Sequence, residues 1–160
     1  MSEQRVFAAA DAKVQVSRDL SLIAPKFRAA VEAAIAECNA AGFDAWVYEA
    51  FRTQELQTVY YNRGVSKAKS VLYSWHGYGL AVDVISKANG WDVSSEWLEG
   101  VARIFKSHGL HWGGDWVSFK GDDPHFQWHC DGMNETPSNH ARELMANGGK
   151  EAVWSAVHAS

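Results

Sequence analysis

Residues 74–83 read SWHGYGLAVD, a stretch in which a histidine and an aspartate flank two glycines just before an apolar run. This pattern predicts half of a metal site, because imidazole nitrogens and carboxylate oxygens are both zinc ligands. A fully extended chain would place His76 and Asp83 roughly 23 Å apart at ~3.3 Å per residue, so both can reach one ion only if the segment folds back. Gly77 and Gly79 permit that fold, since glycine tolerates positive φ.

The other half of the site is expected in residues 122–129, which read DDPHFQWH. One histidine from this segment, together with His76 and Asp83, would give zinc two histidines and one carboxylate. The fourth position would stay open to water, which is typical of catalytic rather than structural zinc sites. Such a site would lower the pKa of the water toward ~7 and polarise a peptide carbonyl.

The two histidines of this segment can be separated by geometry. In a strand over residues 125–129, His125 and His129 would lie ~13 Å apart, too far to bind one ion together. We favour His125, because Asp122 lies three residues before it across a turn fixed by Pro124 and could reach a zinc-bound water. Asp122 would then act as the general acid/base. The alternative is a turn carboxylate that caps the backbone before Pro124.

With these residues the sequence resembles a known family, the zinc D-alanyl-D-alanine/L-alanyl-D-glutamate metallopeptidases of bacterial cell walls and phage lysis enzymes. The family pattern reads S-x-H-x-x-G-x-A-x-D, followed by an acidic residue three positions before a second histidine. The chain fills every place, with Ser74, His76, Gly79, Ala81, Asp83, Asp122 and His125. The similarity covers about residues 18–130, and within the family an aspartate at position 122 is similar to the endopeptidase branch.

The resemblance also points to substrate-binding residues. Arg52, followed by Gln57, is similar to the substrate-binding arginine region of the family. The planar fork of Arg52 could hold a carboxylate or a developing oxyanion, and the alternative is a surface ion pair with Glu49 or Glu55. Ser74 is expected to donate a hydrogen bond to the substrate or to a ligand. Serine-hydrolase chemistry is disfavoured, because no G-x-S-x-G motif surrounds Ser74.

Composition bounds the class of protein. The chain has 160 residues, 47% of them hydrophobic and 21% charged, as in ordinary globular domains, and we expect one catalytic domain over residues 1–160 without a separate wall-binding module. A net charge of −4 argues against nucleic acid as a partner. No apolar run approaches the ~20 residues that span a membrane. Cys38 and Cys130 lack C-x-x-C spacing and are expected to be free and buried.

The order of elements predicts an α+β fold, with a small antiparallel sheet that carries the zinc site and packs against helices. Helices are expected over residues 19–41, 53–62 and 94–107, with two short helices over residues 141–146 and 152–157 broken at Gly148–Gly149. Strands are expected over residues 45–51, 80–85 and 125–129. Residues 112–116, WGGDW, predict a turn that brings aromatic side chains to the rim of a cleft or into the core.

The leading hypothesis is therefore a zinc endopeptidase that cuts the peptide stem of peptidoglycan, between L-Ala and D-Glu, as a phage or prophage endolysin. We expect a monomer held in the host cytoplasm before lysis, because the N-terminus lacks the continuous apolar core of a secretory signal. One alternative is a D-Ala-D-Ala dipeptidase or carboxypeptidase. Another is a non-catalytic wall-binding module, against which Asp122 argues because binding needs no general base.

Overall fold

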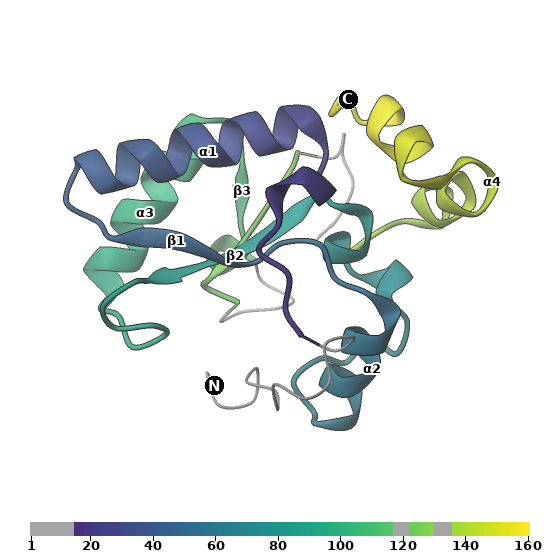
Figure 1. The fold of residues 1–160 in the computed structure, drawn as a ribbon, viewed down its shortest axis with the longest axis horizontal. Coiled ribbons are helices and arrows are strands. Elements are labelled where there is room, and N and C mark those ends of the chain that lie inside the picture. Colours follow the sequence, from purple (N-terminus) through teal and green to yellow (C-terminus); the bar gives the residue numbers. More distant parts are fainter. Residues whose placement is uncertain (1–14, 117–121, 130–135) are drawn as a thin grey trace.

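A four-stranded antiparallel sheet and the helices around it organise the chain (Figure 1). The computed structural model describes residues 15–116, 122–129 and 136–160. The strands are β1 (Ala45–Glu49), β2 (Ala81–Ser86), β3 (His111–Trp112) and β4 (His125–Gln127), in the order β1-β2-β4-β3. The α-helices are α1 (Pro25–Ala40), α2 (Gln54–Asn62), α3 (Ser95–Ser107) and α4 (Asn139–Ala156). Short 3-10 turns are η3 (Leu20–Leu22), η4 (Val71–Tyr73), η5 (Trp75–Tyr78) and η6 (Gly113–Asp115).

Strand β2 is central, and all six of its residues are buried. Its antiparallel pairing with β4 sets Asp83 opposite His125, and its pairing with β1 sets Glu49 opposite Asp83 across a bulge. The predicted antiparallel sheet is confirmed, and the three predicted strands lie within one or two residues of β1, β2 and β4. Strand β3, which shares only Trp112 with the region expected as an aromatic turn, closes the far edge of the sheet by pairing with β4.

Helix α1 begins later than the sequence predicts. Residues 20–22 form the separate turn η3, capped by the Asp19 carboxylate, and the helix starts at Pro25. A proline lacks a backbone N–H, so it suits the first helical position and would break a helix that ran through it. Phe27, Val31 and Cys38 of α1 are buried, as expected for Cys38, whereas Cys130 lies outside the described residues.

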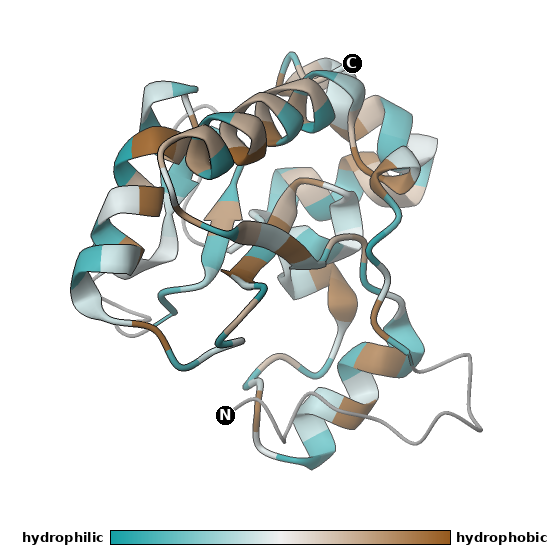
Figure 2. Cartoon of the chain, turned by 60° about the vertical axis from the view of Figure 1, so that its left-hand side comes forward, coloured by the Kyte–Doolittle hydropathy of each residue, from teal (hydrophilic) through white to brown (hydrophobic). Residues whose placement is uncertain are grey.

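The core lies between the sheet and the helices α1 and α3. Phe105 of α3 stacks on Phe126 of β4 with ring centroids 4.2 Å apart, and Phe27 of α1 meets Trp128 edge-on at 6.3 Å. Hydrophobic and hydrophilic residues alternate along the helix ribbons in Figure 2, as expected for helices with one buried side. The predicted α+β arrangement, with helices packed on a small sheet, is therefore confirmed.

Helix α4 caps one end of this core. Gly149 inside it has non-helical dihedral angles, φ 74° and ψ −169°, so the predicted break between two short helices is confirmed. The Trp154 indole donates to the Tyr78 carbonyl at 2.7 Å, and the Trp128 indole donates to the Val157 carbonyl at 2.7 Å. The C-terminal helix thus fastens both η5 and the end of β4.

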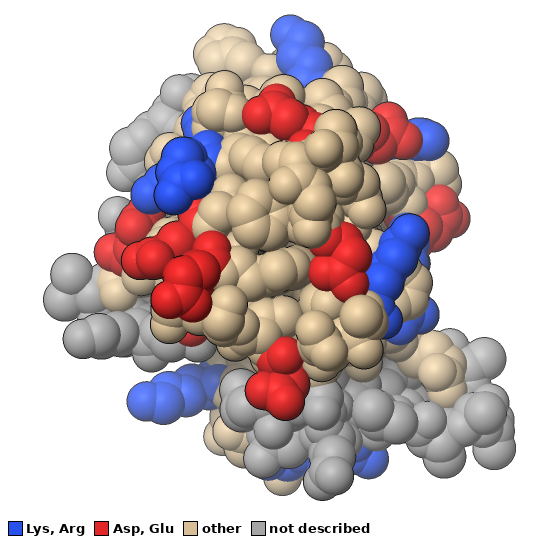
Figure 3. Space-filling view, turned by 90° about the vertical axis from the view of Figure 1, so that its left-hand side faces the viewer, with Lys and Arg blue, Asp and Glu red and all other residues tan. Residues whose placement is uncertain are grey.

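The surface carries both signs of charge. On the face shown in Figure 3, Lys and Arg side chains lie among Asp and Glu side chains. None of the helices in the described part of the chain has the length and apolar character needed to cross a membrane.

Candidate metal centre

His76 is positioned by the turn η5. The Ser74 hydroxyl caps this turn by accepting a hydrogen bond from the His76 backbone N–H at 3.3 Å. Gly79 ends it in the left-handed region, φ 68°, and turns the chain back into β2, as the sequence predicts. Gly77 plays a different part from the one predicted: its φ is not positive, but a β-carbon there would lie 2.6 Å from the Val71 carbonyl oxygen.

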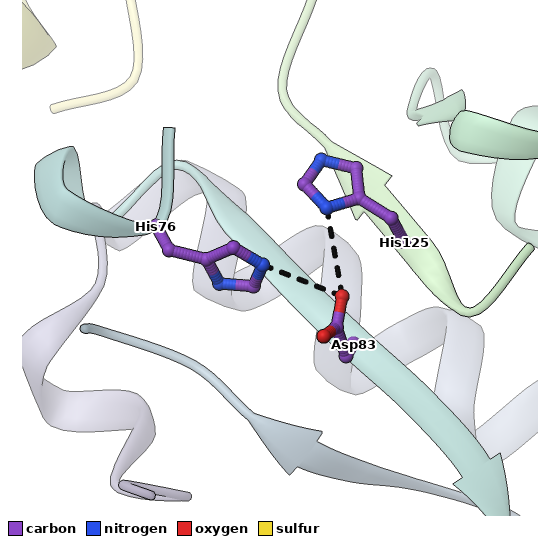
Figure 4. Close-up of side chains that lie close together, drawn as sticks. All are labelled: His76, Asp83 and His125. Carbon is purple, nitrogen blue, oxygen red and sulfur yellow. Dashed lines mark ion pairs between the residues drawn. The ribbon is translucent and has the colours of Figure 1, made fainter. Parts of the chain in front are cut away.

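Asp83 and His125 meet because they are cross-strand partners in β2 and β4. Directly opposed residues on one face of an antiparallel pair have β-carbons about 5 Å apart, which brings both side chains beside His76. His76 Nε2 lies 3.3 Å from Asp83 Oδ1, and His125 Nδ1 lies 3.5 Å from the same oxygen (Figure 4). One ligand atom from each residue lies within 4.8 Å of the other two.

The remaining ring nitrogens of both histidines are held by oxygen acceptors. His76 Nδ1 donates to the Ala50 carbonyl at 2.9 Å, and His125 Nε2 is 2.8 Å from Gln127 Oε1. A proton on each of these nitrogens leaves His76 Nε2 and His125 Nδ1 free to face Asp83. Two neutral imidazoles and one carboxylate, all buried, are a donor set that fits Zn²⁺.

Asp122 lies at the solvent side of the three predicted ligands. Its Oδ2 is 3.8 Å from His125 Nδ1, and its side chain is 34% exposed. Burial lowers the pKa of His125, but the hydrogen bond to Asp83 and the charges of Asp122 and Asp83 outweigh burial and leave that pKa raised. The structure thus brings the predicted general base to the same place as the predicted ligands.

The aromatic turn after β3 lies against this segment. Trp112 Nε1 donates to the Asp123 carbonyl at 2.7 Å, and Trp112 also packs against the edge of the core. The Trp116 ring centroid lies 4.9 Å from that of His125. The core alternative therefore holds for Trp112, which also braces the segment that carries Asp122, whereas Trp116 lies beside a predicted ligand. His129 stacks on Trp128 instead.

Arg52, predicted to contact the substrate, forms an ion pair inside the protein, and its role toward the substrate stays a prediction. Arg52 is only 6% exposed, and its guanidinium donates to both oxygens of Glu49, at 3.0 and 2.9 Å. A third bond runs to Gln57 Oε1 at 2.9 Å, and the Tyr60 ring lies 4.6 Å away. Arg52 therefore forms the ion pair with Glu49 that the sequence offered as an alternative, but in the interior rather than at the surface.

Gln57 and Ser74 are also engaged within the protein. Gln57 is fully buried and donates to the Ser66 hydroxyl at 2.9 Å and to the Ala68 carbonyl at 2.7 Å. Ser74 accepts from the His76 backbone, as the cap of η5. Ser74 thus supports the turn that carries His76, Gln57 supports residues 66–68, and contact of either residue with the substrate stays a prediction.

Two residues next to the site carry no catalytic or metal-binding role in the interpretation of the sequence. Glu49 faces Asp83 across the β1–β2 pair, and Gln127 bonds to His125. For Gln127 a signal was present, because residues 125 and 127 share one face of a strand. Glu49 offered no comparable signal, since the β-bulge at the end of β1 decides its direction.

Comparisons with known proteins agree with this site. A family model described as D-alanyl-D-alanine carboxypeptidase matches residues 67–128, the segment that holds the three predicted ligands. The chain is 35% identical over 130 residues to the peptidoglycan L-alanyl-D-glutamate endopeptidase CwlK of Bacillus subtilis, covering 70% of this chain and 75% of that protein. It is 35% identical over 96 residues to the L-alanyl-D-glutamate peptidase of a Listeria phage, covering 57% of this chain and 32% of that protein.

Solved structures share the fold. The Serratia marcescens L-Ala D-Glu endopeptidase ChiX superimposes with a TM-score of 0.57 at 22% identity, over 78% of this chain and 91% of that one. The vancomycin resistance D,D-pentapeptidase VanY, crystallised in complex with Zn(II), superimposes with a TM-score of 0.53 at 16% identity, over 89% of this chain and 92% of that one. The relationship to the Bacillus enzyme, with the matching family model, shows that the chain belongs to the zinc metallopeptidase family that includes D-alanyl-D-alanine carboxypeptidases and peptidoglycan L-alanyl-D-glutamate endopeptidases.

Proposed function

We propose that this chain is a zinc endopeptidase that hydrolyses the peptide stem of bacterial peptidoglycan at the bond between L-Ala and D-Glu. The observation that carries the proposal is the arrangement of His76, Asp83 and His125 in one buried cluster, with the Asp122 carboxylate at its solvent side. The relatives named as L-alanyl-D-glutamate peptidases support this choice of bond.

The residues divide the chemistry between them. His76 Nε2, one Asp83 oxygen and His125 Nδ1 would hold the zinc. Bound there, zinc would supply Lewis acidity, polarising the scissile carbonyl and lowering the pKa of water toward ~7. Asp122 takes a proton from the attacking water as the carbon–oxygen bond forms, and delivers it to the leaving nitrogen as the carbon–nitrogen bond breaks. The products are a carboxyl end at L-Ala and an amino end at D-Glu.

Asp122 suits the role of proton carrier because of where it lies. A general base has to reach both the attacking water and the leaving group, so it cannot be enclosed with the ligands. At 34% exposure Asp122 is open to substrate, whereas Asp83 is buried and faces both histidines. This difference also argues against a wall-binding module without catalysis, which would need no carboxylate at the opening.

A phage or prophage lysis role is the biological setting we propose, with the bacterial cell wall as the site of action. A peptidase of a Listeria phage among the relatives supports it. The single-domain organisation and the monomeric state stay predictions.

Product analysis tests the scissile bond. Purified peptidoglycan incubated with the chain and zinc should gain new D-Glu amino termini, detected by amine labelling and mass spectrometry, while the glycan strands stay intact. The description of the matching family as D-alanyl-D-alanine carboxypeptidase favours one second candidate. Release of free D-Ala without new D-Glu termini would support that candidate and contradict the proposal.

A further inference from the structure

His125 presents a choice that the fold has to settle. A neutral imidazole carries its proton on either Nδ1 or Nε2, and only the bare nitrogen can bind a metal. In this structure Nδ1 faces Asp83 Oδ1 at 3.5 Å, on the side of the predicted metal, and Nε2 lies 2.8 Å from Gln127 Oε1. The partner of Nε2 therefore determines whether Nδ1 is bare.

The strand places Gln127 for this contact. His125 and Gln127 are two residues apart in β4, so their side chains leave the same face. The neighbour of Gln127 in β2 is Ala81, a small residue. Gln127 is 3% exposed and His125 is 6% exposed, so bulk water does not compete for the bond between them. Buried polar groups are nearly always hydrogen-bonded, so the buried amide and the buried imidazole are expected to keep this bond.

We propose that Gln127 is a positioning residue of the metal centre, whose side-chain carbonyl holds the proton of His125 on Nε2 and so presents Nδ1 to the zinc. The inference rests on the proposed zinc site. Ala50 performs the same task for His76, but through its backbone carbonyl, which a substitution does not remove. Of these two acceptors, only the side-chain carbonyl of Gln127 can therefore be removed by a mutation.

The chemistry of the amide sharpens the proposal. Turned over, the amide of Gln127 would offer its NH₂ group to Nε2 and drive the proton of His125 onto Nδ1, where it would point at Asp83 and block a metal. A glutamate at position 127 has two acceptor oxygens and no donor when ionised, so it can support only the orientation that suits the metal. A methionine has a similar length and is at most a weak acceptor.

The test measures zinc affinity rather than activity. Zinc dissociation constants are determined by competition with a chromophoric chelator for the unaltered chain, Gln127→Met and Gln127→Glu. Gln127→Met should bind zinc about 10–100-fold more weakly, the usual cost of losing such an outer partner. Gln127→Glu should bind at least as tightly as the unaltered chain. Ser86→Ala, which removes a hydrogen bond from an equally buried side chain of β2 to Asp44, is the matched control and should leave the affinity unchanged.

Nitrogen-15 spectra of the histidine rings provide a second readout. In the unaltered zinc-loaded chain His125 should carry its proton on Nε2. Gln127→Met binding zinc as tightly as the unaltered chain, or Gln127→Glu binding more weakly than it, would overturn the role of Gln127. The Gln127→Glu result decides the matter even if Gln127→Met fails to fold. Failure of the unaltered chain to bind zinc would instead overturn the proposed function on which the inference rests.

Discussion

The two carboxylates nearest the histidines differ in exposure. Asp83 is 1% exposed and faces both rings, whereas the Asp122 side chain is 34% exposed. A buried carboxylate between two imidazoles needs a positive partner, which a divalent cation supplies. An open carboxylate keeps access to water and substrate, and so can exchange protons. The same functional group thus has two roles, set by its surroundings.

Replacement of Asp122 tests this division. Asp122→Asn should keep the fold and about the same zinc content but lose at least ~10²-fold in the rate of peptide hydrolysis, because the amide cannot take up the proton. The rate is measured with purified peptidoglycan, and zinc by elemental analysis of the same sample. Asp123→Asn is a matched control on the next residue and should retain most of the rate. Near-normal turnover of Asp122→Asn would return this residue to the role of a turn cap.

Cys38 offers a second prediction at this scale. Burial, and then the charge of Glu37, raise the pKa of the Cys38 thiol from 9.0 to about 12. The thiolate is the reactive form, so Cys38 should resist alkylation at pH 8 in the folded chain and react once urea unfolds it. Peptide mass spectrometry after labelling identifies the site. Because the folded-state pKa is the higher one, ionisation of Cys38 should lower stability as pH rises from about 9 to about 12. Rapid labelling of the native chain would contradict the buried position.

At the scale of elements, a buried ion pair stabilises the junction of β1 and α2. Glu49 and Arg52 are both buried and form a two-bond ion pair, with Tyr60 donating to Glu49 at 3.2 Å. Burial alone would raise the pKa of Glu49, but the charge and the hydrogen bonds of Arg52 overcome it and leave the pKa lowered. The backbone N–H of Arg52 also donates to the His76 carbonyl at 3.0 Å, which ties this junction to the turn of a predicted ligand.

Glu49→Gln should therefore destabilise the chain by about 3–5 kcal/mol, because the buried guanidinium of Arg52 loses its counter-charge. Urea unfolding at neutral pH measures the loss. The control is Glu32→Gln, which breaks the exposed pair with Arg28 and should cost about 0–1 kcal/mol. Because the folded pKa of Glu49 is the lowered one, its contribution is present above the unfolded-state pKa and disappears as pH falls through the folded-state value. Equal losses in the two variants would contradict the ion pair as a main support.

At the scale of the whole molecule, the helices and strands were easier to predict from the sequence than the contacts between them. Local signals sufficed for α3, whose cap Ser94 and apolar spacing are visible in the sequence, and for the ligand pair at residues 76 and 83, which one turn joins. The contact of Asp83 with His125 depends on the register of β2 and β4, which no pattern in the sequence predicts. The burial of the Arg52 side chain could not be predicted from the sequence, because it depends on a bulge in β1 and on how deep the residue lies in the fold.

The C-terminal helix shows what the whole molecule adds. No motif marks it in the sequence, yet Trp154 donates to Tyr78 in the turn that carries His76, and the Val157 carbonyl accepts from Trp128 beyond β4. One element thus links the two segments that carry the predicted ligands. Its contacts explain why the metal centre belongs to the complete fold rather than to residues 74–129 alone.

Zinc content in two histidine variants is the most direct test of whether His76, Asp83 and His125 form the metal centre. The unaltered chain should hold about one zinc ion. His125→Ala should lose it, because two ligands cannot complete a tetrahedral site with an open position. His129→Ala should keep it, since this ring stacks on Trp128 instead of joining the cluster. Both variants are purified alike, checked for folding by circular dichroism and measured by elemental analysis after dialysis. Full zinc in folded His125→Ala, or loss of zinc in folded His129→Ala, would contradict a centre built from His76, Asp83 and His125.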